Sequence, residues 1–160
     1  MKVEQIMKQA VRTCSAHDSL DCIAQSMWET DCGCAPVVDA ENRVVGMITD
    51  RDICMAAYSQ GKALRQLTVE GSMAKRVYCC KGSDSIAEAE RVMQANQVRR
   101  LPVVDEGNHL VGIVSLNDIA TEAQRTVGRG RSKVLAAVGE TLAAIGQPHP
   151  PHAVTATGCG

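Results

Sequence analysis

The chain has almost no aromatic residues. Its 160 residues include one Trp (Trp28), two Tyr (Tyr58 and Tyr78) and no Phe. Stacking on aromatic side chains is a common way to hold unpaired bases, and this sequence offers little material for it. Any planar ligand is therefore expected to lie mainly between aliphatic walls.

The chain also lacks an excess of charge of either sign. Its formal net charge is −1, whereas non-specific binding to nucleic acid or to an anionic membrane surface needs a basic excess. No apolar run approaches the roughly 20 residues that span a bilayer, and Met1 to Gln5 carry no apolar signal segment. We therefore expect a cytoplasmic protein without nucleic-acid or membrane partners.

Cysteine, by contrast, is plentiful, with eight residues. Without an export signal these are expected to be reduced thiols. Four stand where a strand or helix needs a small apolar residue: Cys14, Cys22, Cys54 and Cys80. Of the other four, Cys32, Cys34 and Cys79 leave open a thiol- or metal-responsive site, although the sequence lacks the two separated Cys-x-x-Cys or Cys/His pairs that zinc sites usually show.

The sequence contains an internal repeat with a fixed offset. Three pairs set this offset at 66 (102 − 36, 112 − 46, 118 − 52): Pro36 and Pro102, Gly46 and Gly112, Asp52 and Asp118. The repeated units span about residues 3–58 and 69–124. Each unit alone is small for an independent core, so the halves are expected to pack together about a pseudo-two-fold axis.

Periodicity predicts the order strand, helix, strand, strand, helix in each half. In the first half these are a strand over 11–14, a helix capped by Asp18 and ending near Thr30, strands Cys34–Val38 and Val44–Ile48, and a helix from Thr49 or Asp50. In the second half they are Val77–Cys80, Ser85–Ala95, Leu101–Val104, Leu110–Val114 and Leu116–Arg125. Together they predict a four-layer α+β arrangement. Gly46, inside a strand, indicates either a close approach of another group or a bulge.

After Arg125 the repeat stops. Gly128 to Arg131 reads as a flexible basic hinge. Five apolar residues then share one helical face: Val134, Leu135, Val138, Leu142 and Ile145. This appended helix needs a covering surface, on its own module or on a second subunit. We therefore divide the chain into residues 1–62, 63–125, 126–146 and a flexible tail, 147–160.

The second strand of each hairpin ends in a hydroxyl residue with an Asp three positions later. The pairs are Thr49 with Asp52 and Ser115 with Asp118. One interpretation is a capping box that only starts the next helix. The other is a ligand site, because a helix N-terminus attracts phosphate and a carboxylate accepts both hydroxyl protons of a ribose. The second interpretation predicts a nucleoside phosphate at each turn.

Duplicated in one chain, these motifs resemble a tandem pair of cystathionine-β-synthase (CBS) domains, over about residues 1–125. The stretch from Gln97 to Asp105 is similar to free-standing bacterial members of this family. The resemblance implies two β-α-β-β-α units, a homodimer, and clefts between the repeats that bind AMP, ADP, ATP, S-adenosylmethionine or NAD. It implies a non-enzymatic sensor that needs no cofactor. This sensor would act on a separate effector chain.

The resemblance also implies roles for individual residues. Asp52 and Asp118 match ribose-binding acids, and Thr49 and Ser115 match hydroxyls near ribose or phosphate. Arg51 matches an arginine near the phosphate. The other matching or neighbouring positions, beside the base or along the ligand, are Thr13, Ala35, Pro36, Cys79, Arg100, Leu101, Pro102 and Asn117.

The two predicted sites differ. The site at Asp118 is assigned Cys79 and Asn117 where the site at Asp52 is assigned Thr13 and Arg51, so it lacks one hydroxyl and one cation. Two cations either compensate for this loss or belong to the solvated surface: Arg99 and Arg100. At the site of Asp52, Asp50 adds a negative charge near the predicted phosphate, and the positive charge of Arg51 offsets it. We therefore predict that the site at Asp52 binds phosphate better.

Two alternatives stay open beside the nucleotide sensor. One is a ligand-free interaction scaffold, and the other is a sensor that uses Cys32, Cys34 and Cys79. An enzyme is disfavoured because the sequence has no phosphate-loop glycine pattern, no nucleophile elbow and no His-rich metal motif.

Overall fold

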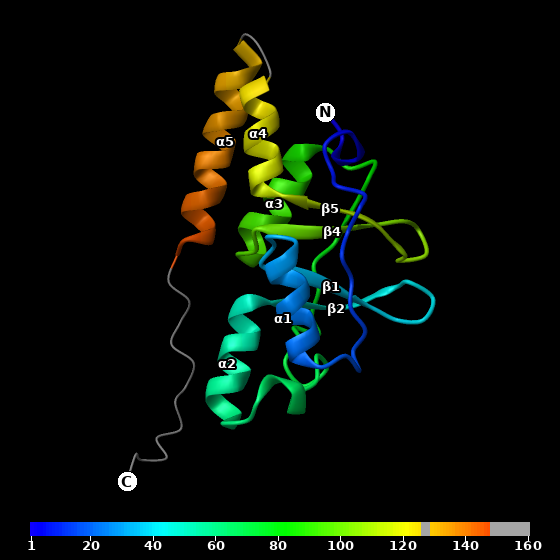
Figure 1. Cartoon of the computed structure of the whole chain (residues 1–160). Coiled ribbons are helices and arrows are strands. Elements are labelled where there is room, and N and C mark those ends of the chain that lie inside the picture. Colours follow the sequence, from blue (N-terminus) through cyan, green and yellow to red (C-terminus); the bar gives the residue numbers. More distant parts are fainter. Residues whose placement is uncertain (126–128, 148–160) are drawn as a thin grey trace.

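Two hairpins lie next to each other in the middle of the molecule, with helices above and below them (Figure 1). This computed structural model describes residues 1–125 and 129–147. The first half contains η1 (Val3–Gln5), α1 (Leu20–Glu29), β1 (Cys34–Val38), β2 (Val44–Thr49), α2 (Asp50–Gln60) and η2 (Leu64–Gln66). The second half contains β3 (Cys80–Lys81), α3 (Ile86–Asn96), β4 (Arg100–Val104), β5 (Leu110–Ser115), α4 (Leu116–Arg125) and α5 (Arg129–Ile145).

The predicted α+β fold with two related halves is confirmed, but the first strand of each half is shorter than expected. In the second half only Cys80–Lys81 pairs with β4, in parallel. In the first half the predicted strand over 11–14 is wrong, because only Cys14 forms an isolated parallel bridge, to Val37.

The start of α1 also differs from the prediction. Ser19, not Asp18, is the N-cap residue, in an extended conformation. The Asp18 carboxylate instead accepts a hydrogen bond from the Ser15 N–H, at 2.8 Å. From there Leu20, Ile23 and Met27 are buried at helical spacing, as the sequence predicts.

There are two apolar cores, and each includes residues of the other repeat, such as Val3 in the second core and Val69 in the first. The glycine of each hairpin lies against a methionine of the other half. The β1–β2 register slips between Val37 and Val38, opposite Val44 to Gly46, which marks a bulge. An ideal Cβ on Gly46 would lie 2.4 Å from Sδ of Met73. Both interpretations of Gly46 therefore hold, since the close approach and the bulge occur together.

Extended segments cross from each half onto the hairpin of the other. Lys8 pairs with Ile113 of β5, through two backbone hydrogen bonds of 2.9 Å. In the symmetric place Ala74 pairs with Met47 of β2, at 2.8 and 3.0 Å. The residues that follow then return to their own half. Each strand-to-helix turn is therefore bordered by chain from the opposite repeat.

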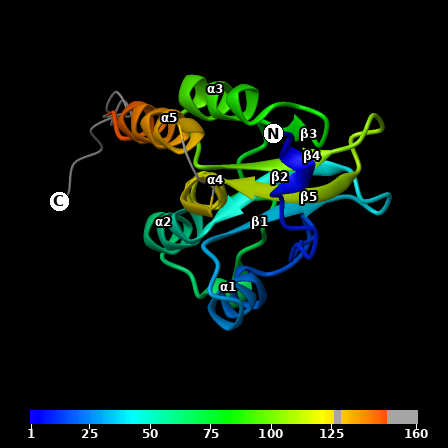
Figure 2. The same cartoon turned by 90° about the horizontal axis from the view of Figure 1, so that it is seen from above.

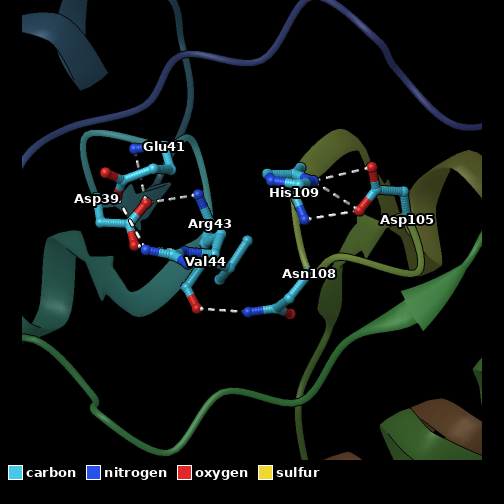
Figure 3. A network of polar contacts seen from close by, with 7 residues as sticks. All are labelled: Asp39, Glu41, Arg43, Val44, Asp105, Asn108 and His109. Atoms are coloured by element: carbon cyan, nitrogen blue, oxygen red, sulfur yellow. Dashed lines mark hydrogen bonds and ion pairs between the residues drawn. The ribbon is translucent and has the colours of Figure 1, made fainter.

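The two hairpin turns also bind each other reciprocally. Asn42 donates its side-chain amide to the Leu110 carbonyl, and Asn108 donates to the Val44 carbonyl, both at 3.1 Å. Both asparagines have left-handed backbones, with φ of 63° and 64°, which Asn tolerates better than most residues. Figure 3 shows Asn108 reaching Val44 between the Asp39–Arg43 and Asp105–His109 turns. These pairs, related by the offset of 66, place the pseudo-two-fold axis between the turns.

The appended helix α5 packs against α3 and α4 of its own chain, as Figures 1 and 2 show. Ile145 is buried in the core of the second half, with Val134 and Val138 against it, so the covering surface is the chain's own module. Leu135 and Leu142 are exposed, so the predicted single apolar face is only partly used. The helix begins at Arg129, and the predicted hinge is therefore wrong for Arg129 to Arg131, while residues 126–128 and 148–160 lie outside the described part. None of the helices in residues 1–125 and 129–147 has the length and apolarity to cross a membrane.

Candidate functional site

The two strand-to-helix turns have the same local geometry. In the first, Asp52 Oδ2 accepts hydrogen bonds from the Thr49 N–H (2.9 Å) and Oγ1–H (2.7 Å). The Asp52 N–H in turn donates to Thr49 Oγ1, at 3.2 Å. Ser115 and Asp118 make the same three contacts. The capping box predicted from the sequence is therefore present at both turns.

The second carboxylate oxygen distinguishes the two turns. Asp118 Oδ1 lies 3.5 Å from Nζ of Lys8, which comes from the crossing segment. Asp52 makes no ion pair among the described residues, and its side chain borders a cleft. At the first turn, the second carboxylate oxygen of Asp52 is thus open to a ligand beside the N-terminus of α2. At the second turn, the equivalent oxygen of Asp118 is engaged by Lys8.

The cleft at Asp52, which we call the Asp52 cleft, has a volume of about 920 Å³ and gathers residues from both halves and from α5. The lining residues of the first half are Gly33, Cys34, Met47 and residues 49–52. Those of the second half are Ala74 and residues 76–78 and 97–100, and the end of α5 adds residues 145–147. The volume lies within the range typical of small-molecule sites.

Positive charge dominates the lining of this cleft. Four arginines border it: Arg51, Arg76, Arg99 and Arg100. None of them forms an ion pair within the part of the chain that the structure describes, although the Arg76 guanidinium lies 5.3 Å from the centre of the Tyr78 ring. The carboxylates in the lining are Asp50 and Asp52. Unpaired guanidinium groups around one cavity suit an anionic ligand, and phosphate in particular.

A sequence model of the CBS domain matches residues 3–59 and again residues 65–125. The chain belongs to the CBS domain family. Hypoxic response protein 1 of Mycobacterium tuberculosis is 37% identical over 115 residues, which are 72% of this chain and 80% of that protein. A tandem CBS pair therefore accounts for both halves described above.

Solved structures agree with this assignment. The crystal structure of Hypoxic Response Protein I with two coordinated zinc ions is 36% identical, with a TM-score of 0.69, over 76% of this chain and 98% of that one. The CBS domain pair of protein MJ0100, in complex with 5′-methylthioadenosine and S-adenosyl-L-methionine, is 26% identical. Its TM-score is also 0.69, again over 76% of this chain and 98% of that one.

The lining of the Asp52 cleft differs from the residues predicted for it. Thr13 was assigned to the site at Asp52, but it is exposed and is not part of the Asp52 cleft. The segment that borders Asp52 is the one before Cys79, with Arg76, Val77 and Tyr78. Arg99 and Arg100, considered as compensation at Asp118, line the Asp52 cleft. Neither Thr13 nor Cys79 lines the Asp52 cleft, and their places at the two sites stay predictions.

Ala35 and Leu101, which were predicted to frame the base, do not line the cleft, and neither do the prolines that follow them. All four are buried: Ala35, Pro36, Leu101 and Pro102. Their preceding neighbours, Cys34 and Arg100, do line it. Asn117 is exposed beside Asp118, at the position where the first half has Arg51.

Several lining residues were not predicted: Arg76, Tyr78, Gln97, Val98, Ile145, Gly146 and Gln147. Gln97 has a left-handed backbone (φ 52°) at the end of α3. Its side-chain amide donates to the carbonyls of Ala144 (3.3 Å) and Gln147 (3.2 Å). The end of α5 is thereby held against the cleft by a residue that also lines it.

Four of the cysteines, Cys14, Cys34, Cys79 and Cys80, do not have the character of reactive thiolates. Burial raises the pKa of both Cys14 and Cys80 to about 12. Burial also raises the pKa of Cys34, against the opposing effect of Arg100, and the pKa of Cys79. A raised pKa keeps these groups as thiols at neutral pH. Among the described residues, no group of three or more His, Cys, Asp or Glu side chains is placed to hold a metal ion.

Proposed function

We propose that this CBS pair is a non-enzymatic regulatory module that binds an adenosine-containing nucleotide in the Asp52 cleft. One observation carries the proposal: the open carboxylate of Asp52 and four unpaired arginines border the same cavity. The carboxylate can accept the ribose hydroxyls, and the N-terminus of α2 with the nearby guanidinium groups attracts phosphate.

The charge of the cleft favours phosphate-bearing ligands over S-adenosylmethionine. Its four arginines and two aspartates give a net charge of +2 (4 − 2), which repels a sulfonium cation. The MJ0100 pair, whose structure contains 5′-methylthioadenosine and S-adenosylmethionine, supports the adenosine part of the proposal. For this chain we expect AMP, ADP, ATP or NAD to bind more tightly than adenosine or S-adenosylmethionine.

The experiment is thermal unfolding with each of these six compounds, on protein freed of co-purified nucleotide. A ligand at about 100 times its dissociation constant adds roughly 2.7 kcal/mol to the free energy of unfolding, which raises the melting temperature by several degrees in a domain of this size. Asp52→Ala is expected to abolish the shift. Asp118→Ala is the matched control, because it removes the same helix cap from the other turn and should leave the shift intact.

Two results would reject the proposal. One is the absence of a shift with every compound, which would favour the ligand-free scaffold. The other is a shift that survives Asp52→Ala and disappears in Asp118→Ala. The homodimer, the separate effector chain and the cytoplasmic location stay predictions.

A further inference from the structure

Lys8 and Ala74 occupy equivalent places in the two halves. Their positions differ by the repeat offset (74 − 8 = 66). Each residue exchanges two backbone hydrogen bonds with the second strand of the opposite hairpin, Lys8 with Ile113 and Ala74 with Met47. The backbone therefore holds both side chains at the same place beside a strand-to-helix turn, and only the side chains differ.

The difference between the Ala74 and Lys8 side chains determines whether the nearby aspartate is accessible. The Ala74 side chain ends at Cβ, and Ala74 lines the Asp52 cleft. The Lys8 side chain extends to Asp118, where Nζ lies 3.5 Å from Oδ1. Since Asp118 Oδ2 already accepts from Ser115, both oxygens of Asp118 are engaged. The Asp118 side chain is only 13% exposed.

The surroundings of Asp118 also lack two of the cations found at Asp52. The equivalents of Arg51 and Arg76 are Asn117 and Ala10 (51 + 66 = 117, 76 − 66 = 10). Lys8 cannot replace them as a phosphate anchor while it lies at the carboxylate. Its ammonium group forms an ion pair with Asp118 Oδ1, the acceptor that a ribose hydroxyl would use.

We propose that Lys8 closes the Asp118 site to nucleosides and so limits each chain to one bound nucleotide. The inference rests on the proposed function of the Asp52 cleft. The ion pair itself is weak, since the Lys8 side chain is 69% exposed and exposed pairs contribute little. The exclusion depends instead on volume and on competition for Asp118 Oδ1, at a position that the backbone fixes.

The test is the number of nucleotides bound per chain, measured by titration calorimetry with AMP and with ATP. Wild type is expected to bind one and Lys8→Ala two, the second more weakly. Lys8→Ala combined with Asp118→Ala should return to one, which assigns the new site. In the opposite direction, Ala74→Lys should weaken binding to the Asp52 cleft at least tenfold. Lys2→Ala, which removes another exposed lysine near the N-terminus, should behave as wild type.

The outcomes separate this inference from the proposed function. Wild type binding one and Lys8→Ala also binding one would overturn the role of Lys8 alone. The same conclusion follows if wild type binds two, or if folded Ala74→Lys binds like wild type. Binding to Lys8→Ala but not to wild type would support Lys8 and reject the Asp52 cleft. No binding to either protein would overturn both.

Discussion

The helices α1 and α3 are equivalent in the two repeats, but α3 also packs against the appended helix α5. On α3, the side-chain amide of Gln94 donates to Thr141 of α5, at 2.7 Å. The equivalent residue on α1 is Trp28 (94 − 66 = 28), whose exposed fraction is 88%. The inward faces of both helices bury apolar residues in the same pattern. The two repeats thus share the same buried pattern. Their outward faces differ, because the outward face of α3 contacts α5 where α1 has the exposed Trp28.

The largest expected effect tests whether α5 is part of the second core. Ile145 is buried at 7% exposure in that core, so Ile145→Ala should lower the free energy of unfolding by about 2–4 kcal/mol. Leu142, on the same helix, is 57% exposed, and Leu142→Ala should change it by less than about 0.5 kcal/mol. Urea denaturation measures both. Equal effects would mean that α5 does not belong to the core.

The second prediction compares the hairpin glycines. A Cβ on Gly112 would lie 3.0 Å from the carbonyl oxygen of Lys8, which is backbone, and 2.8 Å from Met7 Sδ. At Gly46 the near atoms belong to the flexible side chain of Met73. Gly112→Ala should therefore destabilise by about 2–3 kcal/mol and Gly46→Ala by about 1 kcal/mol, as measured by urea denaturation. The reverse order would contradict this, because it would mean that the Lys8 backbone yields more easily than the Met73 side chain.

The third prediction concerns the N-caps of the two helices. Ser85 Oγ accepts from the Glu88 N–H at the start of α3, whereas Ser19 makes no such side-chain cap bond at α1. Ser85→Ala should lower the free energy of unfolding by about 1 kcal/mol, and Ser19→Ala by a few tenths. Thermal unfolding of both variants checks the difference. A loss at Ser19 as large as that at Ser85 would contradict it.

The smallest effect depends on pH and comes from Glu90, which lies on α3 where α1 has Ala24. Burial, and next the charge of Glu140, raise the pKa of Glu90, and its Oε1 has no hydrogen-bond partner among the residues that the structure describes. The folded protein therefore binds this proton more tightly than the unfolded chain. The resulting stability is fully present below the unfolded pKa and is lost as the pH rises through the folded pKa.

Glu90→Gln removes this titration. The variant should be more stable than wild type at pH 7, and the difference should shrink towards about pH 4, near the ordinary pKa of glutamate. Urea denaturation across this range measures it. Glu140→Gln is the control, because Glu140 is exposed and should give a smaller change in the same direction. A difference that does not vary with pH would exclude the carboxyl as its cause.

The sequence predicted the parts of the fold that depend on local pattern. Both hairpins, the helices after them and the contacts of Thr49 with Asp52 follow from residues close together in the chain. The set of residues that line the Asp52 cleft cannot be predicted in this way. Arg76 and Tyr78 reach it because their segment crosses onto the other hairpin, and the backbone pairing of Ala74 with Met47 has no signature in the side chains. The end of α5 borders the cleft only through tertiary packing.

The crossing segments also set the order in which the chain can fold. Val3 donates its N–H to the carbonyl of Asp84, and Lys8 pairs with Ile113, which are 81 and 105 residues later (84 − 3, 113 − 8). During synthesis Val3 and Lys8 must therefore wait for most of the second repeat before they find their partners. Such distant pairings raise the contact order and slow folding. Neither repeat, expressed alone, would contain all the strand partners that its own hairpin uses.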